Sequence, residues 1–533
     1  MKRFVCALLG ILSASIALAQ DGSHPAEIQP AILVEGLGET HHPVSTTSVE
    51  AQRFFDQGLA FTYAFNHDEA LRSFRRAGEL DSSCAMAQWG IALSMGPDLN
   101  MDDDSGREKA ACEAIRKARA LAPKASREER AYIAALAARY SENPGADRNR
   151  LRSDYKNAMF ALARKYPDDP DAATLYAESV IMAAPSRSLW DQDGKAVSPD
   201  TGKAIAALES VLRRDPRHVG ANHYYIHAIE GSPNPERAFA SAVRLPVLAP
   251  GAGHLVHMPA HIYLLIGDYE AAARSCEAAA VVDRAYIKSG ATGSYPLMYY
   301  THNLHFMAVA YGMEGRFSDA IKAAGELEAY AAPHIRDMPM LEDFMATSTF
   351  LLVRFHHWEE ILNAPAAASA TASQVAASRF ARGMAFAATG KIEEAKKELQ
   401  TLGREKKGST VLDVAGNILA GKIALAEGNR TGAIKLLNKA LRQEDSLPYT
   451  EPPGWQIPVR ELLGGAFFSG GDYSAAENAF REDLVRHPGN GRSLFGLCES
   501  LKAQGKDFAS QTVHEEFLRA WKNADVTLQI SDF

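Results

Sequence analysis

Residues 204–250 read AIAALESVLRRDPRHVGANHYYIHAIEGSPNPERAFASAVRLPVLAP, and this stretch contains the pattern that decides the fold. Ala204 lies twelve residues before Pro216, and the same pair recurs 34 positions later as Ala238 and Pro250. A fixed period of 34 residues, with a small residue inside one helix and a proline after it, is typical of a repeated helical hairpin. One hairpin cannot bury its apolar face alone, so the sequence predicts an all-α stack of hairpins, a solenoid.

The same register continues through most of the chain. The twelve-residue offset recurs in three more pairs, namely Ala111 and Pro123, Ala158 and Pro170, and Ala476 and Pro488. In other hairpins the alanine of the A-x-x-x-large pattern is present at the same position of the repeat, as Ala70, Ala272, Ala320, Ala395 and Ala433. The period and the A-x-x-x-large…P pattern resemble the tetratricopeptide repeat (TPR) family. That resemblance implies a TPR-like superhelix over residues 51–524, with histidine-rich central repeats at about 218–310.

The ends of the chain have a different composition. Residues 1–19 combine Lys2 and Arg3 with an apolar run and a small-x-small ending, which is typical of a signal peptide and predicts a periplasmic or secreted protein. Residues 20–50 predict an extended leader or linker, and residues 525–533 a C-terminal tail. No later apolar run approaches the roughly 20 residues of a transmembrane helix, so no stable membrane anchor is expected.

Charge and cysteine content exclude two classes of site. The net charge of −8 does not suit a phosphate-binding surface, so nucleic acid is not an expected partner. Cys84, Cys112, Cys276 and Cys498 show no CxxC spacing, which argues against a thiolate metal site. Two alternatives remain for these residues. Either Cys84 and Cys112 form a disulfide, or all four are buried free thiols, and we favour the free thiols.

Histidine is concentrated in the central repeats, where eight of the 17 histidines lie between residues 218 and 305. Residues three, four and seven apart share one face of a helix, and the histidines follow these spacings on three successive segments. The candidate metal ligands are His223, His227, His254, His257, His261, His302 and His305.

These histidines also align between repeats. Shifts of 34 and then 48 residues superimpose them in three columns, in which seven of nine positions are histidine and the exceptions are Gly220 and Val309. In TPR proteins the first helix of each repeat lines the concave groove, so the resemblance implies that the columns face it. Nitrogen ligands without cysteine predict one or two transition-metal ions, zinc or copper first, with iron or nickel as alternatives.

The reaction stays open at this stage. Glu230 follows His227 by one turn and is a candidate general base for a metal-dependent hydrolase or oxidase, a ligand, or a residue that orients the ligands. The rival hypothesis is a scaffold that binds a peptide, a small molecule or a partner protein in the groove without metal. The motifs HYYIH, HLVHMPAH and THNLH resemble a bacterial exported subgroup of TPR proteins, which implies the fold but no reaction.

One segment interrupts the helical pattern near the end of the chain. Residues 451–461 read EPPGWQIPVRE, with three prolines and a tryptophan among otherwise helical repeats. The segment forms either one wall of a pocket or a loop that only starts the next helix.

Overall fold

The computed structural model describes residues 31–100, 104–143, 145–291, 293–364, 371–405 and 409–533. The predicted signal peptide and residues 20–30 lie outside this part. The helices of the first half are α1 (Val49–Tyr63), α2 (His67–Leu80), α3 (Ala85–Met95), α4 (Ser105–Leu121), α5 (Arg127–Ala137), α6 (Arg148–Lys165), α7 (Pro170–Ala183), α8 (Asp200–Arg214), α9 (Val219–Glu230), α10 (Phe239–Leu248), α11 (Gly253–His257), α12 (Pro259–Ile266) and α13 (Tyr269–Lys288). Those of the second half are α14 (Thr301–Glu314), α15 (Phe317–Ala331), α16 (Thr347–Arg354), α17 (Trp358–Asn363), α18 (Ala372–Ala388), α19 (Ile392–Glu405), α20 (Thr410–Ala426), α21 (Arg430–Glu444), α22 (Val459–Phe468), α23 (Tyr473–Arg486), α24 (Gly491–Ala503) and α25 (Asp507–Ala520).

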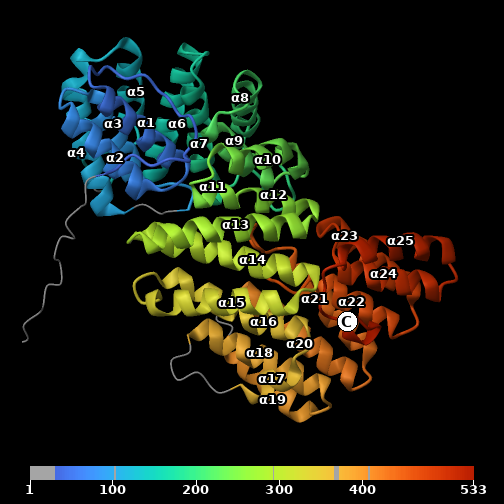
Figure 1. Ribbon diagram of the computed structural model, residues 1–533. Coiled ribbons are helices and arrows are strands. Elements are labelled where there is room, and N and C mark those ends of the chain that lie inside the picture. Colours follow the sequence, from blue (N-terminus) through green and yellow to red (C-terminus); the bar gives the residue numbers. More distant parts are fainter. Residues whose placement is uncertain (1–30, 101–103, 144, 292, 365–370, 406–408) are drawn as a thin grey trace, which may run out of the picture.

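The predicted all-α solenoid is confirmed. Successive helices pack as hairpins that follow one another along the chain, from blue through green and yellow to red in Figure 1. Apart from one isolated bridge between Trp190 and Ala196, the described residues form no β-structure. All the alanines that set the register except the half-buried Ala158 are fully buried, because neighbouring helices approach there too closely for a larger side chain. They include Ala70, Ala111, Ala204, Ala238, Ala272, Ala320, Ala395, Ala433 and Ala476.

The superhelix closes on itself at its C-terminal end. Trp521 packs on Gly315, where an added Cβ would lie 2.3 Å from the indole ring. Asp525 accepts hydrogen bonds from the backbone N–H groups of Phe317, at 2.7 Å, and Ser318, at 2.9 Å. We call these contacts the C-terminal clasp. They hold the last hairpin beside the central repeats, where Figure 1 shows the red helices next to the yellow-green ones.

The leader packs along the solenoid instead of extending into solvent. Its described part has no helix before Val49, and Gly36 accepts a hydrogen bond from the N–H of Gly251 at 2.7 Å. Further along, a His42 ring nitrogen lies 2.8 Å from a carboxylate oxygen of Asp171 on α7. The leader therefore belongs to the folded unit.

The described part of the chain contains neither a candidate membrane helix nor a disulfide. None of its helices is both long and apolar enough to cross a bilayer. The four cysteines beyond residue 30 are free, and all but Cys112 are buried. Three of the four thiols are therefore buried as expected, whereas Cys112 is only half-buried.

Candidate metal centre

Six of the seven predicted histidine ligands converge in two groups of three. The first trio is His223, His227 and His254, and the second trio is His257, His261 and His302. Helix α9 supplies the first two residues of the first trio, and α11 supplies the third. The second trio takes one residue each from α11, α12 and α14.

The imidazoles of each trio present their Nε2 atoms to one another. In the first trio, Nε2 of His223 lies 3.1 Å from Nε2 of both His227 and His254. In the second trio, Nε2 of His261 lies 3.1 Å from that of His257 and 3.4 Å from that of His302. Nitrogens about 2.0–2.1 Å from a tetrahedral ion are about 3.4 Å apart, so both trios have nearly the spacing of metal ligands.

Hydrogen bonds at Nδ1 determine which ring nitrogen carries the proton in the first trio. Nδ1 of His223 lies 2.6 Å from the backbone oxygen of Tyr63, and Nδ1 of His227 lies 2.9 Å from Oε1 of Glu230. Both partners can only accept, so each Nδ1 donates its hydrogen. When both rings are neutral, their Nε2 atoms, only 3.1 Å apart, face each other with bare lone pairs.

The second trio has the same arrangement. Nδ1 of His257 lies 3.1 Å from Oδ1 of Asn303, whose amide nitrogen donates to the backbone oxygen of Cys276 at 3.1 Å. Nδ1 of His261 lies 2.9 Å from Oε2 of Glu230 and also contacts the Glu451 carboxylate. Both rings are thus held by acceptors at Nδ1, and their Nε2 atoms face a common centre.

Burial keeps most of these rings neutral. Removal from water lowers the pKa of His223, His254, His257 and His302 well below the ordinary value, and neighbouring histidines lower it further. His261 differs, because Glu451 and Glu230 outweigh its burial and raise its pKa to about 10. Burial thus disfavours a proton on His223 or His254 of the first trio, and a metal ion is another cation that these Nε2 atoms could hold.

The two trios are copies of one arrangement. The first two histidines of the first trio each map onto the second trio after 34 residues, and His254 maps onto His302 after 48. Each trio thus combines two histidines of one repeat with one from the next. His305 begins a third copy, but Val309 follows at the position where the next histidine would lie. Nε2 of His305 instead lies 2.7 Å from the side-chain nitrogen of Gln456, outside both trios.

One phenyl ring covers each trio. The centroid of the Phe65 ring lies 4.5–5.6 Å from the three imidazoles of the first trio. Phe306 lies 4.7–5.1 Å from those of the second. An aromatic ring also explains why Gly220 interrupts the histidine columns. A Cβ at this position would lie 2.5 Å from the Tyr63 ring, so no larger residue fits. The phenyl rings exclude water from one side of each trio.

A cavity of about 200 Å³ opens beside the trios. Glu230 lies on its wall, with each oxygen bound to a histidine of a different trio. Burial would raise the pKa of Glu230, but His227 and His261 lower it well below the ordinary value, so it stays a carboxylate. With both oxygens engaged, its position suits orientation of the two rings better than proton abstraction.

The loop after α21 supplies the opposite wall. Tyr449, Thr450 and Glu451 line the cavity together with the histidines. Burial, together with Glu230, raises the pKa of Glu451 to about 8. Pro453, Trp455 and Pro458 of the proline-rich segment line a separate cavity of about 310 Å³, and the residue of this segment that lines the histidine cavity is Glu451. Its contact with His261, 190 positions earlier in the chain, has no signal in the spacing.

A group of one histidine and two carboxylates at the leader has a different character from the trios. His42 lies close to Asp169 and Asp171. The two oxygens of Asp171 are already bound, one to His42 and the other to His218 and Tyr63. Hydrogen bonds satisfy this carboxylate, so the group serves to dock the leader.

Comparison with known proteins adds only overall similarity. No family model and no curated protein matches the chain. Among solved structures, human IFIT1 bound to m7Gppp-AAAA has 13% identity and a TM-score of 0.36, covering 82% of this chain and 90% of that one. The Cut9–Hcn1 hetero-tetramer of the APC/C has 15% identity and a TM-score of 0.31, covering 89% and 74%. The fold assignment rests on the repeats of this chain itself.

Proposed function

We propose that this protein binds two transition-metal ions, one in each histidine trio, with zinc or copper as the metal. The opposed lone pairs of the first trio carry the proposal. Acceptors hold Nδ1 of His223 and of His227, and burial disfavours protonation of His223 and His254. A cation between the Nε2 atoms turns this repulsion into coordination.

The protein offers three nitrogen ligands to each ion, as catalytic metal sites do. A fourth position then remains for water or substrate, and four of the six histidines reach the 200 Å³ cavity. We therefore propose an enzyme acting on a small molecule in that cavity, a hydrolase with zinc or an oxidase with copper. The predicted signal peptide supports a periplasmic location, and Glu230 is proposed to orient the ligands.

The test is elemental analysis of the purified mature protein after loading with zinc or copper. We expect two ions per chain in the wild type and one in either His223→Gln or His257→Gln. His305→Gln is the matched control, because this histidine belongs to the same columns but to neither trio. It should retain two ions.

Absence of metal from the wild type after both loadings would favour the scaffold that binds a peptide or partner in the groove. Two ions in all three variants would contradict the assignment of the trios. Nitrogen sites generally bind copper more tightly than zinc, so the element present in protein purified without added metal selects between hydrolase and oxidase assays.

A further inference from the structure

The separate cavity of about 310 Å³, which we call the apolar cavity, lies between the central repeats and the loop after α21. Much of its wall consists of apolar side chains. Helices α12 and α14 contribute Leu264, Leu265, Val309 and Met313, and the loop contributes Leu447, Pro453 and Trp455. Its size is at the lower end of the range for small-molecule sites, which are lined mainly by such side chains.

The apolar cavity continues the faces of the two helices that hold His261 and His302 of the second trio. On α12, Leu264 and Leu265 follow His261 by three and four residues. On α14, Val309 follows His302 by seven residues. Residues at these spacings share one face of a helix. The groove therefore changes from histidine to apolar side chains along its length, and the change on α14 falls at Val309, where the histidine columns end.

The apolar cavity and the histidine cavity share one wall. Tyr449, Thr450 and Glu451 line both of them. Trp455 fixes the loop just beyond these residues, because it is buried and its Nε1 donates to the backbone oxygen of Ile457 at 2.5 Å. A molecule too long for the histidine cavity therefore meets the apolar cavity next to it.

The two arginines at the apolar cavity are already paired. Arg460 makes two hydrogen bonds of 2.9 Å to the carboxylate of Asp445. Arg486 lies 3.3 Å from the same carboxylate, and half of its side chain is exposed to solvent. On the shared wall, Glu451 contacts His261.

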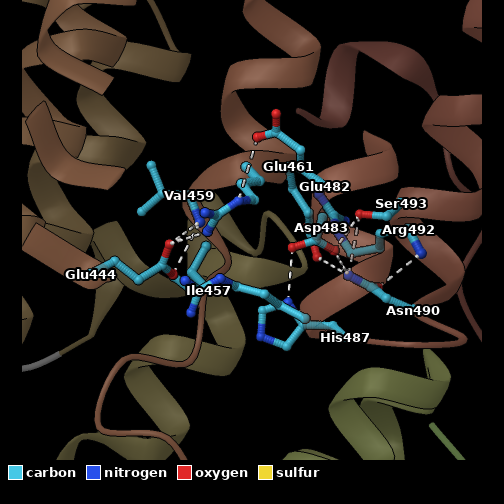
Figure 2. Close-up of polar contacts among 12 residues, drawn as sticks. Glu444, Ile457, Val459, Glu461, Glu482, Asp483, His487, Asn490, Arg492 and Ser493 are labelled. Atoms are coloured by element: carbon cyan, nitrogen blue, oxygen red, sulfur yellow. Dashed lines mark hydrogen bonds and ion pairs between the residues drawn. The ribbon is translucent and has the colours of Figure 1, made fainter. Parts of the chain in front are cut away.

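The other charged groups at this cavity also have protein partners. Glu444 accepts a hydrogen bond from the N–H of Val459 at 3.2 Å, and Nδ1 of His487 lies 2.9 Å from the carboxylate of Asp483. Figure 2 shows both contacts. A charged ligand would lose its hydration here and would have to compete with these partners, whereas an uncharged ligand loses little.

We propose that the apolar cavity binds an uncharged apolar group, and that this group belongs to the small molecule that reacts in the histidine cavity. The second half of the proposal rests on the proposed function, and the first half does not. The reacting end of the molecule lies at the second trio, and its apolar end lies against Leu265 and Val309. Burial of apolar surface at that end supplies binding energy in proportion to the area covered.

Ligand-observed NMR of the full chain tests the first half, both before and after metal loading. The probes are hexan-1-ol, hexane-1-sulfonate and hexylammonium, which have the same chain and differ in charge. We expect the alcohol to bind at least about tenfold more tightly than either ion in both states, because only the ions lose the hydration of a charge.

Two variants locate the binding. Val309→Glu places a charge in the apolar wall, and Leu265→Trp fills the cavity from α12, so each should weaken hexan-1-ol at least about tenfold. Both positions are only half-buried, so the fold should persist, and the unfolding temperature checks this. Val281→Glu is the matched control, because it makes the same substitution at a side chain of α13 that is 65% exposed. It should bind the alcohol as the wild type does.

A series of hydroxamates tests the second half in metal-loaded protein, because the hydroxamate head chelates a metal ion. We expect octanohydroxamate to bind at least about tenfold more tightly than acetohydroxamate in the wild type and in the Val281→Glu control. The advantage of the longer chain should disappear in Val309→Glu and in Leu265→Trp.

Equal binding of the three hexyl probes, or unchanged binding in both cavity variants, would overturn the first half. Binding of hexan-1-ol without any effect of chain length on the hydroxamates would overturn the second half. A chain that takes up no metal would contradict the proposed function and the second half with it, while hexan-1-ol still decides the first.

Discussion

Replacing Glu230 with alanine removes the one carboxylate that orients a histidine in each trio. Nδ1 of His227 then has no acceptor, whereas Nδ1 of His261 retains its contact with Glu451. Loss of such a partner weakens metal binding about 10- to 100-fold, or about 1.4–2.7 kcal/mol. We expect this loss at the first trio and a smaller one at the second.

The assay is competition with a chromogenic chelator in two single-site backgrounds. His257→Gln leaves the first trio and His223→Gln leaves the second. Adding Glu451→Ala to Glu230→Ala should extend the full loss to the second trio, whereas Glu236→Gln, an exposed carboxylate near the site, should change neither. A larger loss at the second trio than at the first, or no loss at either, would refute the role of these carboxylates.

Three further predictions concern stability. Gly220→Ala places a Cβ 2.5 Å from the Tyr63 ring and should destabilise the fold by about 1–3 kcal/mol in chemical denaturation, while weakening metal binding at the first trio only. Chelation of both ions should lower the unfolding temperature, since at a free metal concentration 1,000 times Kd each ion contributes about 4 kcal/mol; an unchanged temperature in metal-loaded protein would contradict this. Burial opposes protonation of His42, but Asp171 raises its pKa above the ordinary value, so its ion pair stabilises the docked leader at low pH and is lost as pH rises through that pKa. Limited proteolysis of residues 31–48 should therefore be faster at pH 9 than at pH 6, and His42→Ala should remove the difference.

The period of 34 residues and the histidine columns were sufficient to predict the solenoid and all six residues of the trios. They were sufficient because residues at equivalent positions of successive repeats occupy equivalent places in the stack of hairpins. The columns did not predict which three histidines form each trio. Each trio combines histidines from two columns of one repeat with a histidine from the third column of the next repeat. That combination depends on the offset between packed helices, which spacing alone does not define.

Other parts of the candidate site had no local signal. Phe65 comes from the turn after α1 and Glu451 from the loop after α21, and both reach the histidines only through the curvature of the superhelix. His305 matched the columns but lies outside both trios, because Val309 replaces the histidine one turn later. Periodicity predicts which face a side chain occupies, whereas long-range contacts decide what it meets there.

A solenoid in which each repeat touches only its neighbours behaves as a spring, since small changes at every interface add up along its length. The C-terminal clasp joins Trp521 and Asp525 to the turn at Gly315. It therefore links the last hairpin directly to the central repeats and limits how far the repeats between them can extend. The spacing between Glu451 and the second trio is then set partly by a junction at the far end of the chain. If tension opened the clasp and shifted the C-terminal repeats, the contact of Glu451 with His261 at the candidate metal centre would change with them.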